Sequence, residues 1–165
     1  MRKACWPYLL VLLCVACNSD SSNPPPADVA GTWFMTATNA DSATFTNCSG
    51  DFALFQGDTV ADTLPPILTS SAGGLAPVVT QNGTMWSMMP QTIFGVENIA
   101  SGDVNGNSIS GRFDGVDSAS TLTLFFNGVV TGDSMAINVH TGRLTGAVVG
   151  ECSIDPPLAV DVFLQ

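Results

Sequence analysis

Residues 120–140 read STLTLFFNGVVTGDSMAINVH and contain two runs in which apolar and polar side chains alternate. The alternating apolar residues are Leu122, Leu124 and Phe126 in the first run, and Met135, Ile137 and Val139 in the second. A period of two is typical of a strand with one buried and one solvated face, as in antiparallel sheets. Gly132-Asp133 between the runs tolerates the positive φ of a tight turn. The stretch therefore predicts a β-hairpin.

The same pattern and the same kind of turn recur along the chain from Val29 onward. Asn82-Gly83 and Asn105-Gly106-Asn107 each separate two short apolar runs, as hairpin turns do. The expected strands lie near residues 29–38, 50–56, 76–81, 84–89, 99–104, 108–114, 120–131, 134–140, 143–151 and 158–164. Residues 57–75, which include Pro65-Pro66, are expected to form a long loop, and no helix is predicted because strong helix formers are scarce.

These expectations define an all-β domain built as an antiparallel meander of about eight to ten strands. A run of hairpins leaves two exposed edge strands, and closure into a barrel removes them. A closed or nearly closed β-barrel is therefore the first prediction, and a two-sheet β-sandwich is the alternative.

The first seventeen residues have the pattern of an export signal. Met1-Arg2-Lys3 is positively charged, and residues 4–16 are uncharged and end in small side chains, as in a secretory signal peptide. Cys14-Val15-Ala16-Cys17 resembles the lipobox of bacterial lipoproteins, in which the final cysteine is acylated before the signal is removed. That family usually has Leu three residues before the acylated cysteine, where this chain has Cys14. The alternative is ordinary cleavage after Ala16 and secretion.

The lipoprotein resemblance implies a membrane anchor at Cys17 and a location in the bacterial cell envelope. Asn18 occupies the position at which that family's inner-membrane retention signal has Asp, which favours the outer membrane. The expected organisation is a signal peptide at residues 1–16, a Pro/Ser-rich tether at 17–28 and a single β domain at 29–165. No segment is long and apolar enough to predict a transmembrane helix.

Charge excludes one class of partner. Without residues 1–16, two arginines against fourteen Asp and Glu leave a net charge of −12. Such a chain is repelled by the phosphates of nucleic acids. Nucleic-acid binding is therefore not expected.

Two cysteines remain once the signal is removed and Cys17 is acylated. An even pair in an exported protein most simply forms a disulfide, here between Cys48 and Cys152. The alternatives are two free thiols or a two-cysteine metal site. A catalytic role is not expected for either cysteine.

Gly31-Thr32-Trp33, which opens the first expected strand, resembles the Gly-x-Trp motif of lipocalins. The resemblance implies that Trp33 packs at the closed end of a barrel against an arginine from a late strand, for which Arg143 is the candidate. It also implies an interior cavity for a small apolar ligand. The family's later motifs are missing from the sequence, and Gly-x-Trp occurs in other small barrels.

Two stretches contain residue types that bind metals. Asp103, Asn105, Asn107 and Asp114 partly follow the spacing of a calcium loop, but Ser108 stands where that loop requires Gly. A hairpin turn explains the same residues. Met85-Trp86-Ser87-Met88-Met89 offers soft sulfur ligands suited to copper, although methionine beside tryptophan is more often packing. No metal or other cofactor is predicted.

Gly132-Asp133-Ser134-Met135 resembles the nucleophile block of GDSL-type hydrolases, but the sole histidine, His140, lies only six residues later. The two side chains would be about 20 Å apart on an extended strand. We therefore predict no catalytic residues and no enzyme. The sequence favours a binding module for a small apolar ligand, with an envelope protein-interaction or structural module as the alternative and a hydrolase as a remote third.

Overall fold

The computed structural model describes residues 24–63, 76–93 and 95–165, and it confirms the predicted all-β fold. Ten strands form one antiparallel sheet, with two short helical segments between the second and third strands. The strands are β1 (Gly31–Ala37), β2 (Thr44–Gly50), β3 (Val78–Asn82), β4 (Met85–Met88), β5 (Gln91–Ile93), β6 (Val96–Asn105), β7 (Ser108–Val116), β8 (Ser120–Thr131), β9 (Ser134–Gly146) and β10 (Gly150–Leu164). The helical segments are η1 (Asp51–Phe55) and α1 (Val60–Thr63).

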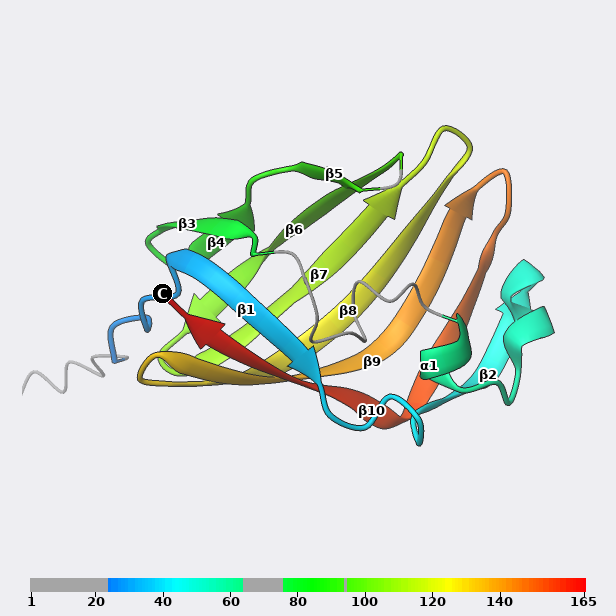
Figure 1. Ribbon diagram of the computed structural model, residues 1–165, viewed down its shortest axis with the longest axis horizontal. Coiled ribbons are helices and arrows are strands. Elements are labelled where there is room, and N and C mark those ends of the chain that lie inside the picture. The colour runs from blue at the N-terminus through cyan, green and yellow to red at the C-terminus, as the bar shows by residue number, and fades with distance from the viewer. Residues whose placement is uncertain (1–23, 64–75, 94) are drawn as a thin grey trace, which may run out of the picture.

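Hydrogen bonds run around a ring of eight strands, so the sheet is a nearly closed barrel. The order along the sheet is β1-β3-β4-β6-β7-β8-β9-β10, and β1 also pairs with β10, which closes the ring. In Figure 1, β1 and the last part of β10 lie side by side across the curved sheet of β6 to β9. The seam between β1 and β3 is short, because only Gly31 and Thr32 have partners in β3.

Strand β10 joins two partners on the same side. Its last residues, Val160 to Leu164, pair with β1, whereas its first residues, Gly150 to Asp155, pair with β2. β1 and β2 therefore act as one interrupted strand along β10. The remaining strand outside the ring, β5, pairs with β6.

An aromatic cluster fills part of the barrel interior. The ring centroids of Trp33 and Trp86 are 5.0 Å apart, those of Trp86 and Phe126 5.8 Å, and those of Phe126 and Phe113 4.8 Å. Both indoles are buried. Gly111 on β7 lies beneath the cluster, where an added Cβ would be 2.5 Å from Trp86 Cζ2.

The disulfide predicted between Cys48 and Cys152 is confirmed as a bonded pair, with an S–S distance of 1.94 Å. It joins β2 to β10 across 104 residues of sequence. Beside it, Phe52 of η1 packs between Phe45 and Phe55, with centroid distances of 5.5 and 5.6 Å. The disulfide therefore ties β2 to β10 of the barrel wall, and the contact between Phe52 and Phe45 packs η1 against β2.

Two expected strands are wrong, and two further expectations are corrected in part. Residues 50–56 were expected to form a strand, but β2 ends at Gly50 and η1 follows. A register shift near Asn47, whose φ is 51°, interrupts the alternation of apolar and polar residues in β2. The sequence pattern therefore did not predict that strand. Residues 143–151 are not a separate strand, since β9 continues to Gly146 and β10 begins at Gly150. The expected absence of helix and the long loop at 57–75 are also corrected in part, because α1 begins at Val60.

The chain enters the barrel at the end that carries the β3–β4, β6–β7 and β8–β9 turns, which we call the tether end (Figure 1). The backbone amide of Ala27 donates to Gly106 O, and Gln81 bonds the backbone of both Ala27 and Val29. Gly31 lies against the C-terminal Gln165. The segment before β1 is therefore attached to this end of the domain. Among the described residues no helix is long and apolar enough to cross a membrane.

Candidate functional site

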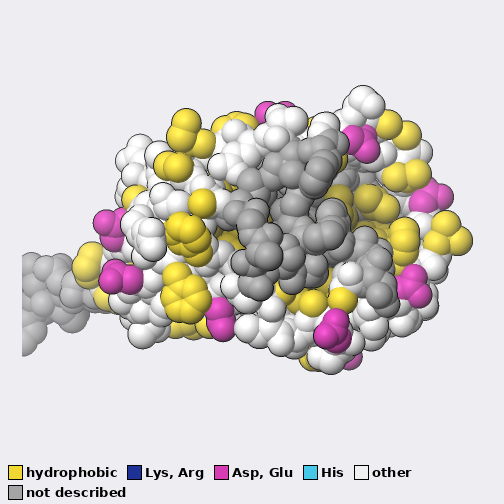
Figure 2. Space-filling view, in the orientation of Figure 1, with side chains coloured by type: hydrophobic (Ala, Val, Ile, Leu, Met, Phe, Trp, Pro, Cys, Tyr) yellow, Lys and Arg dark blue, Asp and Glu magenta, His cyan; other side chains and the backbone are white. Residues whose placement is uncertain are grey.

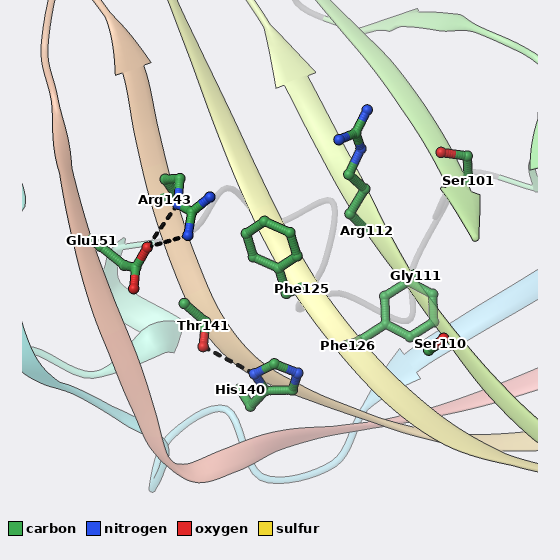
Figure 3. A pocket seen from close by; sticks show the side chains of 10 residues that line it. All are labelled: Ser101, Ser110, Gly111, Arg112, Phe125, Phe126, His140, Thr141, Arg143 and Glu151. Carbon is green, nitrogen blue, oxygen red and sulfur yellow. Dashed lines mark hydrogen bonds and ion pairs between the residues drawn. The ribbon is translucent and has the colours of Figure 1, made fainter. Parts of the chain in front are cut away.

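A depression on the outer wall of the barrel collects the basic side chains of the domain. Its floor and rim come from β6, β7, β8, β9 and β10, and Figure 3 shows the side chains that line it. The residues that matter for the argument are Ser110, Arg112, Phe125, His140, Arg143 and Glu151. Arg112 and Arg143 are the only arginines after residue 3, and His140 is the only histidine of the chain. The face shown in Figure 2 displays acidic but no basic side chains among the described residues.

An extra residue in β9 sets the direction of these side chains. Val139 faces the core, and simple alternation would turn Arg143 inward as well. The register shifts opposite Phe125 and Phe126, so that His140 and Thr141 both lie on the outer side. Such a bulge re-aims the side chains that follow it. Gly142 consequently faces the core, and Arg143 faces the depression.

Arg143 forms the most complete set of contacts in the depression. Its Nη2 and Nε lie 2.6 and 2.7 Å from Glu151 Oε2, and its guanidinium carbon is 5.1 Å from the centroid of Phe125. The Arg143 and Glu151 side chains are 50% and 47% exposed. An arginine stacked on an aromatic ring keeps a fixed orientation while donors remain available to a ligand.

In Figure 3, Arg112 and Arg143 lie on opposite sides of the Phe125 ring. The Nε of Arg112 forms an ion pair with Asp114 Oδ2 at 3.0 Å, and Asp114 in turn accepts a 2.6 Å hydrogen bond from Thr123 Oγ1. Among the described residues, no hydrogen-bond acceptor contacts the terminal nitrogens of Arg112. Two guanidinium groups thus flank one phenyl ring, each oriented by a carboxylate.

His140 completes the depression near its lower edge in Figure 3, where Nδ1 lies 2.9 Å from Thr141 Oγ1. The hydroxyls of Ser110 and Ser101 lie on the neighbouring strands. These groups provide hydrogen-bond donors and acceptors around the two arginines. The arrangement can bind a partner that combines an acceptor oxygen with an apolar group.

The structure separates the two residues expected to pack together at a barrel end. Trp33 is buried in the aromatic cluster, and its Nε1 donates to Val29 O at 2.9 Å. Arg143 lies on the outer wall because of the β9 bulge. Arg143 is therefore not the partner of Trp33, and the neighbour of that indole is Trp86.

The residues of the possible calcium loop do not converge. Asp103 stands opposite Ser110 in the β6–β7 hairpin, whereas Asp114 stands opposite Ile99, near the other end of β7. Asn105 and Asn107 flank the turn at Gly106, whose φ is 56°. Strand pairing extends this segment, so it forms a hairpin and not a cation-binding loop.

The methionine-rich stretch on β4 divides between the two faces of the sheet. Trp86 and Met88 are buried, whereas Met85 and Met89 are 66% and 56% exposed. The three sulfur atoms therefore do not share one face. Within the described ranges no group of three or more His, Cys, Asp or Glu side chains is placed to hold a metal ion.

Ser134 and His140 also remain apart. Ser134 opens β9 and its hydroxyl donates to Thr131 O, while His140 lies six residues along the same strand. A strand rises about 3.3 Å per residue, so the pair is outside hydrogen-bond reach. Cys17, the expected lipidation site, lies outside the described residues.

The sequence had not identified Arg112, Phe125 or Glu151 as site residues. A usable signal exists for Phe125, because it occupies an outward position of the β8 alternation and yet is a large aromatic residue. Comparisons of the chain with protein-family models, with curated proteins and with solved structures found no match. The case for a function therefore rests on the geometry of this depression.

Proposed function

We propose that the protein is a lipid-anchored, non-enzymatic binding module of a bacterial cell envelope, and that it docks an envelope protein at the outer-wall depression. One observation carries the proposal: both arginines and the only histidine of the mature chain surround Phe125. Arginine and aromatic residues are enriched at the energetic centres of protein interfaces. Their concentration at one place in a chain this poor in basic residues favours a docking site.

The partner would present a carboxylate to the guanidinium groups and an apolar side chain to Phe125. Arg112 and Arg143 are already oriented, so little side-chain entropy is lost when they bind. The surrounding acidic surface repels free small anions, whereas a protein surface can place one carboxylate while burying apolar area around it. The lipid anchor would hold the module where envelope partners are concentrated.

The experiment is photo-crosslinking in intact cells, with benzoylphenylalanine in place of Ser110 inside the depression. A control chain has the same residue in place of Thr80, which is exposed on β3. We expect a specific protein adduct only from position 110, and we expect Arg112→Gln with Arg143→Gln to remove it. An adduct that persists in the double variant, or equal capture from position 80, would refute this site.

The anchor is tested separately by mass spectrometry of the natively produced protein. We expect an acylated Cys17 at the new N-terminus and no residues 1–16. An unmodified thiol at Cys17, or an intact leader, would refute the lipoprotein assignment and leave the docking site to be judged by the crosslinking alone.

A small apolar ligand inside the barrel is the second candidate. Phe55, Phe113, Leu122 and Leu144 pack against the core but are only partly buried. They lie away from the tether end, where Trp33 and Trp86 occupy the interior. A fluorescent fatty acid that binds the wild-type chain but not a Leu122→Gln variant would support this candidate, and no binding to the wild type would exclude it.

A further inference from the structure

Exposed apolar side chains form a row on the outer wall beside the tether end. Phe34 on β1 and Phe163 on β10 are direct cross-strand partners, and they are 40% and 54% exposed. Val78, 42% exposed, stands opposite Thr32, two residues before Phe34. Val129, 53% exposed, lines one shallow depression together with Phe163. We call Phe34, Val78, Val129 and Phe163 the apolar row.

The row continues across strands and is not a set of scattered residues. Phe34 comes two residues after Thr32, and Phe163 comes two residues before the last residue, Gln165. Both therefore lie at the same end of the barrel. Figure 2 shows hydrophobic side chains, some of them aromatic, exposed on the half of the molecule that carries β1 and the C-terminus. Contiguous exposed apolar patches mark interaction sites more often than isolated residues do.

The position of the tether identifies the surface that this row meets. Pro24 lies against the β6–β7 turn at Gly106, so the chain reaches the domain at the tether end. Seven residue steps connect Pro24 to Cys17 and can span at most about 25 Å. If Cys17 is acylated, as the proposed function requires, the tether end stays within this distance of the bilayer.

We propose that the apolar row docks on the zwitterionic surface of the membrane that holds the lipid anchor. Phenylalanine and aliphatic side chains insert at the boundary between headgroups and acyl chains when they face a bilayer. The short tether keeps the row at a high effective concentration near that surface. The domain would then lie with its tether end against the lipid, and the Arg112–Arg143 depression would remain open to a partner.

Charge restricts the kind of lipid. Asp161 lines the same depression as Phe163, and Asp133 occupies the neighbouring β8–β9 turn. Both arginines of the mature chain lie elsewhere, in the outer-wall depression. Anionic headgroups would therefore repel this end of the domain. Docking should weaken as phosphatidylglycerol replaces phosphatidylcholine, and added salt should restore it.

The test uses the natively acylated protein in phosphatidylcholine vesicles, with benzoylphenylalanine in place of Thr131 beside the row. A second protein has the same residue in place of Val148, in the β9–β10 turn away from the tether end. We expect lipid adducts by mass spectrometry at position 131 and few at position 148. Phe34→Ser with Phe163→Ser should lower the ratio of docked to free domain about tenfold, since burial of two half-exposed rings is lost.

Leu54→Ser is the matched control, because Leu54 is, among the described residues, the most exposed large hydrophobic side chain, at 85%, and lies on η1 outside the row. It should leave the adducts at position 131 unchanged. If the double variant does not fold, Phe163→Ser alone should still reduce the adducts several-fold.

The outcomes separate the anchor from the docking. An acylated protein that gives equal lipid adducts at both positions, or equal effects of Leu54→Ser and the double variant, would overturn the docking while the anchor stands. A protein adduct or a crosslinked dimer at position 131 would show that a partner or a second copy covers the row, and would also overturn it. A chain without the acyl group would refute the anchor and the docking together.

Discussion

Gly111 should be the position at which the aromatic cluster is least tolerant of added volume. A Cβ at Gly111 would lie 2.5 Å from Trp86 Cζ2, 2.6 Å from the backbone oxygen of Ser101 and 3.1 Å from Phe126 Cζ. The backbone oxygen cannot move without disturbing the β6–β7 pairing. Overpacking of this kind costs about 1–3 kcal/mol, and the loss of glycine's freedom in the unfolded chain offsets about 0.4–1 kcal/mol. We expect Gly111→Ala to lower the free energy of unfolding by about 1 kcal/mol or slightly more.

Gly115 provides a control on the same strand and the same inward face. A Cβ there would be 3.5 Å from Val96 Cγ1, an ordinary van der Waals contact. Gly115→Ala should therefore leave stability unchanged or raise it by up to about 1 kcal/mol. Urea unfolding followed by tryptophan fluorescence measures both variants, since Trp33 and Trp86 are buried in the cluster. Equal free energies of unfolding for the two variants would refute the packing argument.

Three further predictions concern the disulfide, one turn and the outer-wall depression. Replacing Cys48 and Cys152 with Ser should lower the free energy of unfolding by up to about 4.7 kcal/mol, because the bond closes a loop of about 100 residues; a loss below about 1 kcal/mol in urea unfolding would contradict that estimate. Two backbone amides of the β7–β8 turn donate to the Asp117 carboxylate and lower its pKa from 3.8. The stabilising effect of this carboxylate is therefore present above the unfolded-state pKa and lost as the pH falls through the folded-state pKa. The difference in free energy of unfolding between wild type and Asp117→Ala should then become smaller below about pH 4. A difference that stays constant with pH would exclude this explanation. Arg143→Gln should change the free energy of unfolding by less than about 1 kcal/mol, because its ion pair with Glu151 is half exposed; a larger loss in thermal or urea unfolding would indicate a structural role instead of a binding one.

The hairpins were predictable where each strand alternates without interruption. Residues 120–131 and the β8–β9 turn match the structure, since regular alternation and a glycine at positive φ fix both the strand and its end. The closure of the barrel followed from the number of hairpins and the need to remove strand edges. The strand at residues 44–50 was missed, because Phe45 is its only fully buried apolar side chain before the register shift at Asn47.

The candidate site was harder to predict because one extra residue decides which side chains face outward. Sequence alternation through Val139 places Arg143 in the interior, where an arginine beside a buried tryptophan is a reasonable expectation. The bulge opposite Phe125 reverses the alternation and moves the arginine to the outer wall. The position of a bulge depends on the pairing register of two strands. The alternation of side chains along one strand alone therefore does not predict it. The proposed docking site therefore depends on a feature of strand pairing, because one extra residue between Val139 and Gly142 turns Arg143 outward. Deleting His140 should remove the bulge but leave Thr141 outward, Gly142 inward and Arg143 outward, so partner capture at the depression should persist, and its loss would contradict this account of the strand pairing.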